Sequence, residues 1–330
     1  RRSLFLIITV HKNLFIAVAL LAASITAHAA KVDGAPAPEC DGLKIATGPA
    51  GKGYSKVFAD IKKACGNAVP VCEVSTTGGL DNLNTLSTKD ADVGIAQVDT
   101  WATMKSGDEN VAGLQGVVGL NFNYLHVVTA ASGFRIAGEK KFGFLKGDDK
   151  TVLIQRFSDL KGQRVALVGS AQLLGRQIDR SMGYGMNMVD VDSDSKAFDM
   201  VRKGEVAAAM SVSGWPSGSI APLKQDSGLT LVPFDVPANN PQYVVRPINY
   251  KGLGVYNNNA LAVPNVLFTR PFKGEKAQDV SKLRQCLAEK LQELQEGNFQ
   301  PAWNEIKTLG NVYDVPKFGG SQAVASKGKK

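Results

Sequence analysis

Small and polar residues stand directly after several strand-like runs of this 330-residue chain, where their amides and hydroxyls are available to hold a ligand. In the first such turn, Gly48–Ser55, the candidate binding residues are Gly48, Lys52, Gly53 and Tyr54. Glycines let backbone N–H groups approach a ligand, and the start of the following helix favours negative charge. The turn is not a nucleotide-binding P-loop, because Ala46 stands where that motif needs its first glycine. A plain tight turn is the simpler alternative.

Four more turns repeat this strand–turn–helix arrangement. Their candidate binding residues are Thr76, Thr77, Gly78 and Gly79; Gln97 and Asp99; Ser170 and Gln172; and Ser213, Trp215 and Pro216. Lys52 and Arg176 are the candidate partners for a ligand carboxylate. Each turn also has a structural alternative, such as N-capping by Thr77 or Asp81 or a core position for Trp215. Because open α/β sheets bind ligands outside the carboxyl ends of their strands, five such turns together predict a binding site.

Catalytic groups are scarce. The chain has three histidines, and two of them, His11 and His28, belong to its N-terminal segment. The third, His126, lies in an apolar strand-like run and is predicted to be structural. The sequence contains neither a G-x-S-x-G nor a C-x-x-C motif. We therefore expect no catalytic residues, no metal site and no cofactor, and hence not an enzyme.

The first 29 residues are predicted to be a secretory signal peptide. Leu14–Ala23 is a ten-residue apolar run preceded by a lysine and followed by Ala27-His28-Ala29, an A-x-A cleavage pattern. The run is too short to cross a membrane as a helix. We therefore expect export to the periplasm and a soluble mature protein.

Export permits disulfides among the four cysteines, which allow three pairings. Cys65 and Cys72 flank a short turn, so a local bridge between them is favoured. Cys40 would then pair with Cys286.

The elements that must position the turns alternate between strands and helices. The first series has strands at 43–47, 71–75 and 92–96 and helices at 54–65 and 80–87. A second series has strands at 164–168, 188–191 and 206–211 and helices at 173–182 and 195–203. Between them we predict consecutive strands at 117–120 and 124–130 and a surface loop at 138–151. Later we predict a helix starting at 216–223, irregular structure at 235–262, a strand at 266–270 and a helix at 277–295. Short connections indicate two α/β lobes, each a doubly wound sheet with flanking helices.

Charge argues against a nucleic-acid partner. The formal net charge is +8, but the first 29 residues and the C-terminal tail carry much of it. No basic run is interleaved with aromatic residues, so nucleic acid is not expected as a partner.

The motifs together resemble the TAXI family of solute receptors for TRAP (tripartite ATP-independent periplasmic) transporters. The resemblance is carried by Thr76–Leu83 (TTGGLDNL), Ala91–Asp99 (ADVGIAQVD), Phe157–Ala166, Lys203–Ala209 and the Gly214-Trp215-Pro216 turn. It covers roughly residues 43–294.

The resemblance implies a two-lobed, type II periplasmic-binding-protein-like fold. Such a receptor captures a small organic anion or an amino acid, glutamate-like, in the cleft and delivers it to the membrane permease subunits of a TRAP transporter. The ligand would be surrounded by the five turns named above. One departure is Gly169-Ser170-Ala171-Gln172, where the family often has a G-S-G-T-type turn, so Gln172 alters the pocket.

We expect lobe 1 to comprise residues 40–122 plus 250–318, lobe 2 residues 123–249, and a flexible basic tail residues 319–330. We expect a monomer. The alternative function is an exported ligand-sensing or protein-interaction module on the same fold; an enzyme is less favoured.

Overall fold

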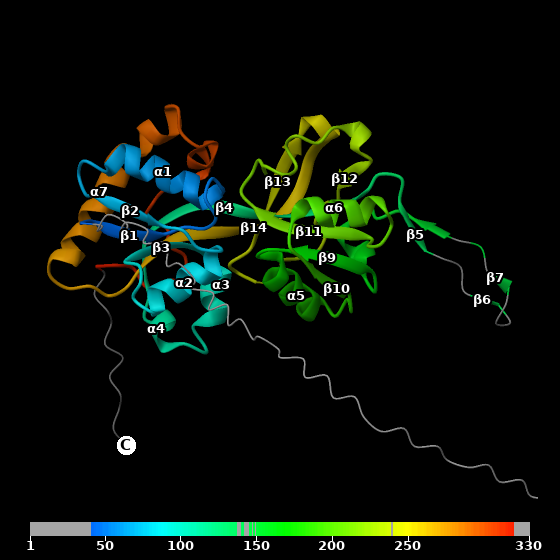
Figure 1. Ribbon diagram of the computed structural model, residues 1–330, viewed down its shortest axis with the longest axis horizontal. Coiled ribbons are helices and arrows are strands. Elements are labelled where there is room, and N and C mark those ends of the chain that lie inside the picture. Colours follow the sequence, from blue (N-terminus) through cyan, green and yellow to red (C-terminus); the bar gives the residue numbers. More distant parts are fainter. Residues whose placement is uncertain are drawn as a thin grey trace, which may run out of the picture. The chain divides into compact units, whose positions relative to one another are not determined.

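A ten-stranded mixed sheet runs through the described part of the molecule, with helices packed on both of its faces (Figure 1). The computed structural model describes residues 41–136, 140–141, 145–146, 148, 150–238 and 240–319. These residues belong to one compact unit, 40–330. The predicted signal peptide, Cys40 and all but the first residue of the predicted tail lie outside the described residues.

The elements alternate as the sequence predicts. The strands of the large sheet are β1 (Leu43–Ala46), β2 (Val71–Val74), β3 (Val93–Gln97), β4 (Gln115–Ala130), β9 (Arg164–Val168), β10 (Asn187–Val191), β11 (Ala208–Ser213), β12 (Leu229–Leu231), β13 (Val244–Tyr250) and β14 (Val255–Thr269). The helices are α1 (Gly53–Cys65), α2 (Gly79–Ser87), α3 (Val98–Met104), α4 (Glu109–Ala112), α5 (Ala171–Met182), α6 (Asp194–Arg202) and α7 (Glu275–Glu296). Short 3-10 helices are η1 (Phe157–Leu160), η2 (Gln225–Ser227), η3 (Lys251–Leu253) and η4 (Pro301–Glu305).

Two long antiparallel strands, β4 and β14, form the middle of the sheet. The strand order is β10-β9-β11-β4-β14-β3-β1-β2, with β12 paired to β4 and β13 to β14. On one side β1, β2 and β3 are parallel, and on the other β9, β10 and β11 are parallel. We call β1–β3 with α1–α4 and α7 the first half of the sheet, and β9–β13 with α5 and α6 the second half.

The register brings the carboxyl ends of both parallel sets to the centre of the sheet. Gln97 at the end of β3 is paired with Asn265 of β14. Ser213 at the end of β11 is paired with Tyr124 of β4. Since Tyr124 is itself paired with Ala262 of β14, the two strand ends lie a few residues apart along the same central ladder.

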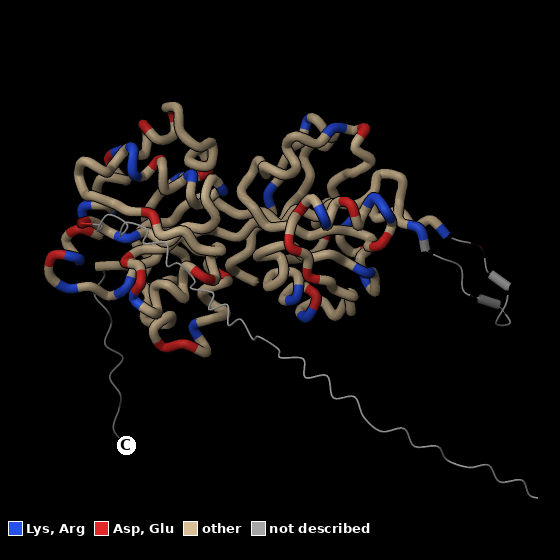
Figure 2. Tube along the Cα trace, viewed as in Figure 1, with Lys and Arg blue, Asp and Glu red and all other residues tan. Residues whose placement is uncertain are grey.

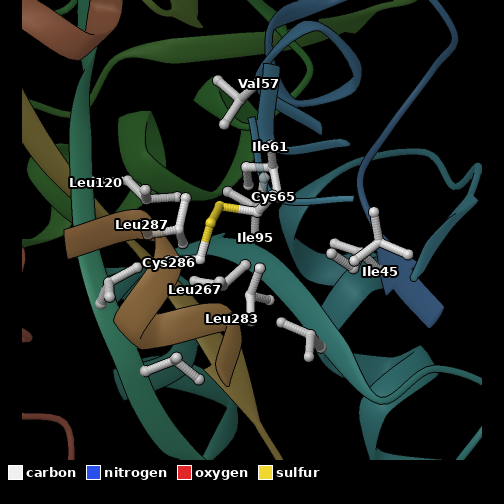
Figure 3. Close-up of a cluster of buried hydrophobic side chains, with 14 of the residues drawn as sticks. Ile45, Val57, Ile61, Cys65, Ile95, Leu120, Leu267, Leu283, Cys286 and Leu287 are labelled. Atoms are coloured by element: carbon white, nitrogen blue, oxygen red, sulfur yellow. A yellow bond between two sulfur atoms is a disulfide. The ribbon is translucent and has the colours of Figure 1, made fainter. Parts of the chain in front are cut away.

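The core of the first half is built where α1 and α7 cover the sheet (Figure 3). Val57, Ile61 and Cys65 recur at helical spacing on α1, so they form one apolar stripe. Leu283 and Leu287 of α7 pack against that stripe and are fully buried. Each such leucine stabilises the fold by about 2 kcal/mol through burial.

The predicted cysteine pairing was wrong. Cys65 forms a disulfide with Cys286, 221 residues away, and joins α1 to α7 inside the core of Figure 3. The sequence suggested Cys65–Cys72 because they are close along the chain. Successive side chains of a strand alternate between faces. Val71 packs in the same core as Cys65, so Cys72, the next residue of β2, points to the opposite face.

Three other predictions were wrong in detail. The two strands predicted at 117–120 and 124–130 are one continuous strand, β4, whose side chains are buried along nearly its whole length. The region 235–262 is not wholly irregular, because it contains β13 and most of β14, where asparagines and prolines are tolerated within an antiparallel ladder. No helix forms at 216–223.

The segment predicted as a surface loop also contains strands. Its described residues include β6 (Lys140–Lys141) paired with β7 (Leu145–Lys146), and β8 (Lys150–Val152) paired with β5 (Phe134–Ile136).

Two broader observations bear on function. Among the described residues, no helix is both long and apolar enough to cross a membrane. Lys and Arg positions are interspersed with Asp and Glu positions in both halves (Figure 2).

Candidate ligand-binding site

The first two predicted turns lie against each other at the carboxyl ends of β1 and β2. A Cβ atom placed on Gly48 would lie 3.7 Å from the Cα atom of Gly78. The Ser75 hydroxyl donates to the Gly48 carbonyl oxygen at 3.1 Å. Gly78 has a φ angle of 135°, which side-chain-bearing residues rarely adopt. Glycine is therefore favoured at position 78 by its φ angle, whereas a Cβ atom at position 48 would make only an ordinary van der Waals contact.

A single buried side chain, Asn82 of α2, joins the ends of three parallel strands. Its Nδ2 atom donates to the carbonyl oxygens of Thr47, after β1, and Ile95, in β3. Its Oδ1 atom accepts from the Thr76 hydroxyl, after β2, at 2.5 Å. Asn82 thus satisfies backbone groups that burial would otherwise leave unpaired. The sequence analysis placed Asn82 within the TTGGLDN motif but did not single it out.

The predicted hydroxyls of this turn are engaged locally. Thr76 also accepts a hydrogen bond from the backbone N–H of Gly78 at 3.1 Å. The backbone N–H and hydroxyl of Thr77 both donate to one carboxylate oxygen of Asp81, at 3.0 and 3.3 Å. Gly79 begins α2 and is packed against Ala96. These bonds shape the helix start, which was the structural alternative for the turn.

Tyr54, the second residue of α1, is part of a closed polar network with the central strands. Its hydroxyl donates to Asn265 Oδ1 at 2.8 Å and accepts from Asn123 Nδ2 at 2.9 Å. Asn265 Nδ2 in turn donates to Asn123 Oδ1 at 3.2 Å. Burial raises the pKa of Tyr54 well above its usual value. Lys52 precedes the helix and is exposed, and Gly53 is its first residue.

Asp99, two residues after the end of β3, is a buried carboxylate between the two halves. Its Oδ1 atom accepts from the backbone N–H of Thr100 at 2.7 Å. Its Oδ2 atom lies 3.2 Å from the Tyr243 hydroxyl, which is also 2.9 Å from Gln177 Oε1 of α5. Burial raises the pKa of Asp99 to about 6, although these hydrogen bonds oppose the shift. Gln97, at the strand end, is itself buried.

A cavity of about 340 Å³ opens beside Asp99, between α3, α5 and the segment 234–243. Its volume is in the range of small-molecule sites. Polar residues lining it come from both halves: Asp99 and Thr103; Gln177 and Ser181; and Asn240, Gln242 and Tyr243. Its apolar lining is Ala102, Ile178, Met182, Phe234, Pro237, Ala238 and Leu261. Gln177 Nε2 donates to the Thr103 hydroxyl at 2.6 Å across the junction.

The predicted residues of α5 lie outside the cavity lining. Arg176 Nη2 is 2.8 Å from Asp190 Oδ1, and its Nη1 donates to the Gln172 carbonyl oxygen at 2.7 Å. Ser170 precedes the helix and its side chain forms no capping hydrogen bond. The residue of α5 that follows Arg176, Gln177, lines the cavity, and the sequence analysis missed it. Because Arg176 already has a carboxylate partner, it is poorly placed to bind another.

The turn after β11 belongs to a separate hydrogen-bonded network. Ser213 Oγ is 3.4 Å from His126 Nδ1, and the Tyr250 hydroxyl is 2.8 Å from His126 Nε2. Burial lowers the pKa of His126 to about 4, so the ring is neutral near pH 7. Trp215 Nε1 donates to the Asn249 carbonyl oxygen at 3.2 Å, and the bond from Trp215 to Pro216 is cis.

The geometry therefore favours binding over catalysis. The buried, neutral His126 lies 3.4 Å from the Ser213 hydroxyl and shares its other nitrogen with a tyrosine, not a carboxylate. In the part of the chain that the structure describes, no group of acidic, histidine or cysteine side chains could hold a metal ion.

Comparison with known proteins gives one family and a set of distant structures. A model of the NMT1-like family matches residues 45–316. No curated protein matches the sequence. The chain is 11% identical to an arginine transport system periplasmic binding protein from Legionella pneumophila, covering 76% of this chain and 93% of that one at a TM-score of 0.44. It is 12% identical to an amino acid ABC transporter substrate-binding protein from Streptococcus pneumoniae bound to L-arginine, covering 80% and 94% at 0.46. A Brucella ovis ABC transporter/periplasmic binding protein with glutathione bound is 14% identical, covering 78% and 74% at 0.45.

Proposed function

Since the chain belongs to the NMT1-like family, we propose that it is a solute-binding receptor that captures a small organic anion or an amino acid between two lobes. The observation that carries this proposal is the cavity beside Asp99, whose polar lining is supplied by α3 and α5 together. A site shared between two halves closes when a ligand bridges them. The proposed receptor binds and releases its solute without transforming it.

The two lobes we propose are residues 40–122 plus 250–318, and residues 123–249. The hydrophobic clusters support the boundary near residue 122 but not the one near residue 250. Two clusters draw only on residues 43–120 and 266–318, and the other two have all their buried members within 122–263. They favour a change of lobe near residue 264, within β14, over one near residue 250. With the boundary near residue 264, β4 and β14 are the described strands that run through both lobes, so bending these two strands would open and close the cleft.

We further propose the transport setting implied by the TAXI resemblance. The receptor would be exported to the periplasm and would deliver its solute to a TRAP permease. The Cys65–Cys286 disulfide supports an oxidising compartment. We expect no nucleic-acid partner, since Lys and Arg positions are interspersed with Asp and Glu positions along the described trace (Figure 2).

The candidate ligand shell is centred on Asp99. Tyr54 is hydrogen-bonded to Asn265, which is paired with Gln97 two residues before Asp99, and this supports a ligand shell that extends to the turn after β1. We therefore keep the glycines of the first two turns, Gly48, Gly53 and Gly78, as positions where a ligand approaches the backbone. Arg176 is the weakest member of the predicted set, since Asp190 occupies its guanidinium.

The test is direct. Native mass spectrometry of freshly purified protein should show a co-purified small molecule, and thermal-shift screening should find solutes that stabilise the fold. Gln177→Ala should weaken binding of the best solute about tenfold, because Gln177 lies in the cavity wall. Gln285→Ala, on the exposed side of α7, is the matched control and should bind normally. If no small molecule binds, the receptor proposal is wrong.

One observation favours the alternative of a protein-interaction module. Val244, Val245 and Tyr256 of β13 and β14 are large apolar side chains exposed by 37%, 41% and 63%. In the described residues, β13 pairs only with β14, so its outer edge is available to another strand. Loss of partner binding in Val245→Lys with unchanged solute binding would assign this edge to a protein partner.

A further inference from the structure

We infer that the cavity beside Asp99 receives a protonated amino group of the solute, with the Asp99 carboxylate as its counter-charge. The inference rests on the proposed receptor function and narrows the class of solute. It favours amino acids and amines over organic acids that lack nitrogen.

The first argument is the charge of the cavity wall. Asp99 is the one acidic side chain among the described residues that line the cavity, and no lysine, arginine or histidine accompanies it. No described cation lies within ion-pair distance of its carboxylate. A wall with one negative charge and no positive charge attracts a cation and repels an anion.

The second argument is the excess of hydrogen-bond acceptors. The oxygen Gln242 Oε1 is buried without any hydrogen-bond partner. Gln177 Oε1 and Asp99 Oδ2 both lie within reach of the single hydroxyl hydrogen of Tyr243, which can serve only one of them at a time. An unpaired buried acceptor costs about 1–3 kcal/mol. An ammonium group brings three donors and would satisfy this deficit.

The third argument is the burial of the carboxylate. Asp99 is 3% exposed. The titratable groups that face it are Tyr54 from α1 and Tyr243 from the segment before β13, and both remain uncharged near pH 7. A buried carboxylate without a cation is destabilising, and Asp99 accordingly holds its proton up to a pH of about 6. A ligand cation would stabilise the ionised form.

An organic anion without nitrogen fits less well. Its carboxylate would have to enter beside Asp99 and share the same low-dielectric space, where like charges repel strongly. An amino acid avoids this conflict, because its ammonium can face Asp99 while its carboxylate points towards the strand-end turns.

The experiment uses the full-length protein and a defined panel at pH 7.5. The panel contains the twenty amino acids, putrescine, spermidine and agmatine, together with three- to six-carbon hydroxy acids and dicarboxylic acids that lack nitrogen. Isothermal titration calorimetry should show that the tightest compound carries an amino group. Its hydroxy analogue should bind at least tenfold more weakly.

Two variants then assign the effect. Asp99→Asn keeps the size of the side chain and should lose at least tenfold in affinity for the amine. Asp192→Asn removes an exposed carboxylate and should bind as the parent does. Circular dichroism establishes that both variants are folded. Affinity of the parent for the amine should also fall as the pH is lowered from 7.5 to 5, as Asp99 takes up its proton.

The outcomes separate the inference from the receptor function. A tightest compound without nitrogen, or unchanged amine affinity in Asp99→Asn, overturns the inference and leaves the receptor intact. Absence of binding across the whole panel overturns both.

Discussion

The two halves of the sheet hold their strand ends in different ways. In the first half one buried side chain, Asn82, is bonded to groups at the ends of β1, β2 and β3. In the second half, α5, which follows β9, is joined to β10 by a partly exposed ion pair between Arg176 and Asp190. The end of β11 is attached to the buried ring of His126.

This difference indicates which half is rigid. A buried amide with all its bonds made fixes the relative position of three turns, whereas a partly exposed ion pair fixes little. The first half also carries the Cys65–Cys286 disulfide. We therefore expect the first half to present a preformed surface to the ligand, and the second half to adjust by closing onto it.

Removal of the disulfide should cause the largest loss of stability. Replacing Cys65 and Cys286 together by serine frees a loop of 221 residues in the unfolded chain. The free energy of unfolding should fall by about 4 kcal/mol, as measured by urea denaturation. Ala68→Ser, in the exposed turn after α1, should leave it unchanged. A double variant within about 1 kcal/mol of the parent would contradict this account.

Asn82→Ala should cause the second-largest loss in the free energy of unfolding. It leaves the Thr47 and Ile95 carbonyl oxygens without their buried donor, so we expect a loss of about 3 kcal/mol. Asn84→Ala, on the exposed side of the same helix, is the matched control and should cost under about 1 kcal/mol. If the two variants are equally stable, Asn82 does not hold the strand ends together.

The buried acid and the buried base should show opposite pH dependence. Because the pKa of Asp99 is raised from 3.8 to about 6, its contribution to stability is present below pH 4 and is lost as pH rises through 6. Asp99→Asn should therefore be more stable than the parent by about 3 kcal/mol at pH 7.5, and by little at pH 4.

His126 has its pKa lowered from 6.5 to about 4, so its contribution is present above pH 6.5 and is lost as pH falls. The difference between His126→Gln and the parent should therefore vary with pH in the opposite direction to that of Asp99→Asn. Thermal unfolding from pH 4 to 7.5 measures both, and parallel curves would refute the assignment.

The smallest effect should come from Arg176→Ala. Its ion pair with Asp190 is 42% and 50% exposed, so its loss should cost under about 1 kcal/mol in the free energy of unfolding. Solute affinity should change less than twofold, in contrast to Gln177→Ala on the same helix. A tenfold loss of solute affinity in Arg176→Ala would contradict this account and would indicate that Arg176 contacts the ligand.

The sequence predicted those parts of the fold that depend on local pattern. The three parallel strands of each half, α1, α5 and α7 are recognisable from periodicity, and the glycine turns from their composition. The residues of the cavity were largely missed. Gln177 and Tyr243 have no local signature, because they meet Asp99 only when α5 and the segment before β13 pack beside α3.

The same limit explains the other errors. Asn82 resembles any polar residue of an amphipathic helix until its three partners are brought around it. Cys65 could pair with Cys72 only if Cys72 pointed to the same face of β2 as the core around Cys65. Proximity along the chain favoured this wrong partner. The asparagine-rich β13–β14 region resembles a loop because its ladder is formed with a distant strand as well as within the hairpin.

The disulfide also links two distant parts of the described chain, which would otherwise separate after the backbone between them is cleaved. Cys65 lies near the start of the described residues and Cys286 near their end. Most of the helices and strands therefore belong to the covalent loop that the disulfide closes. A protease that cuts a single peptide bond anywhere inside that enclosure yields two fragments that stay attached. The nicked molecule would migrate as one species on a denaturing gel until a thiol is added.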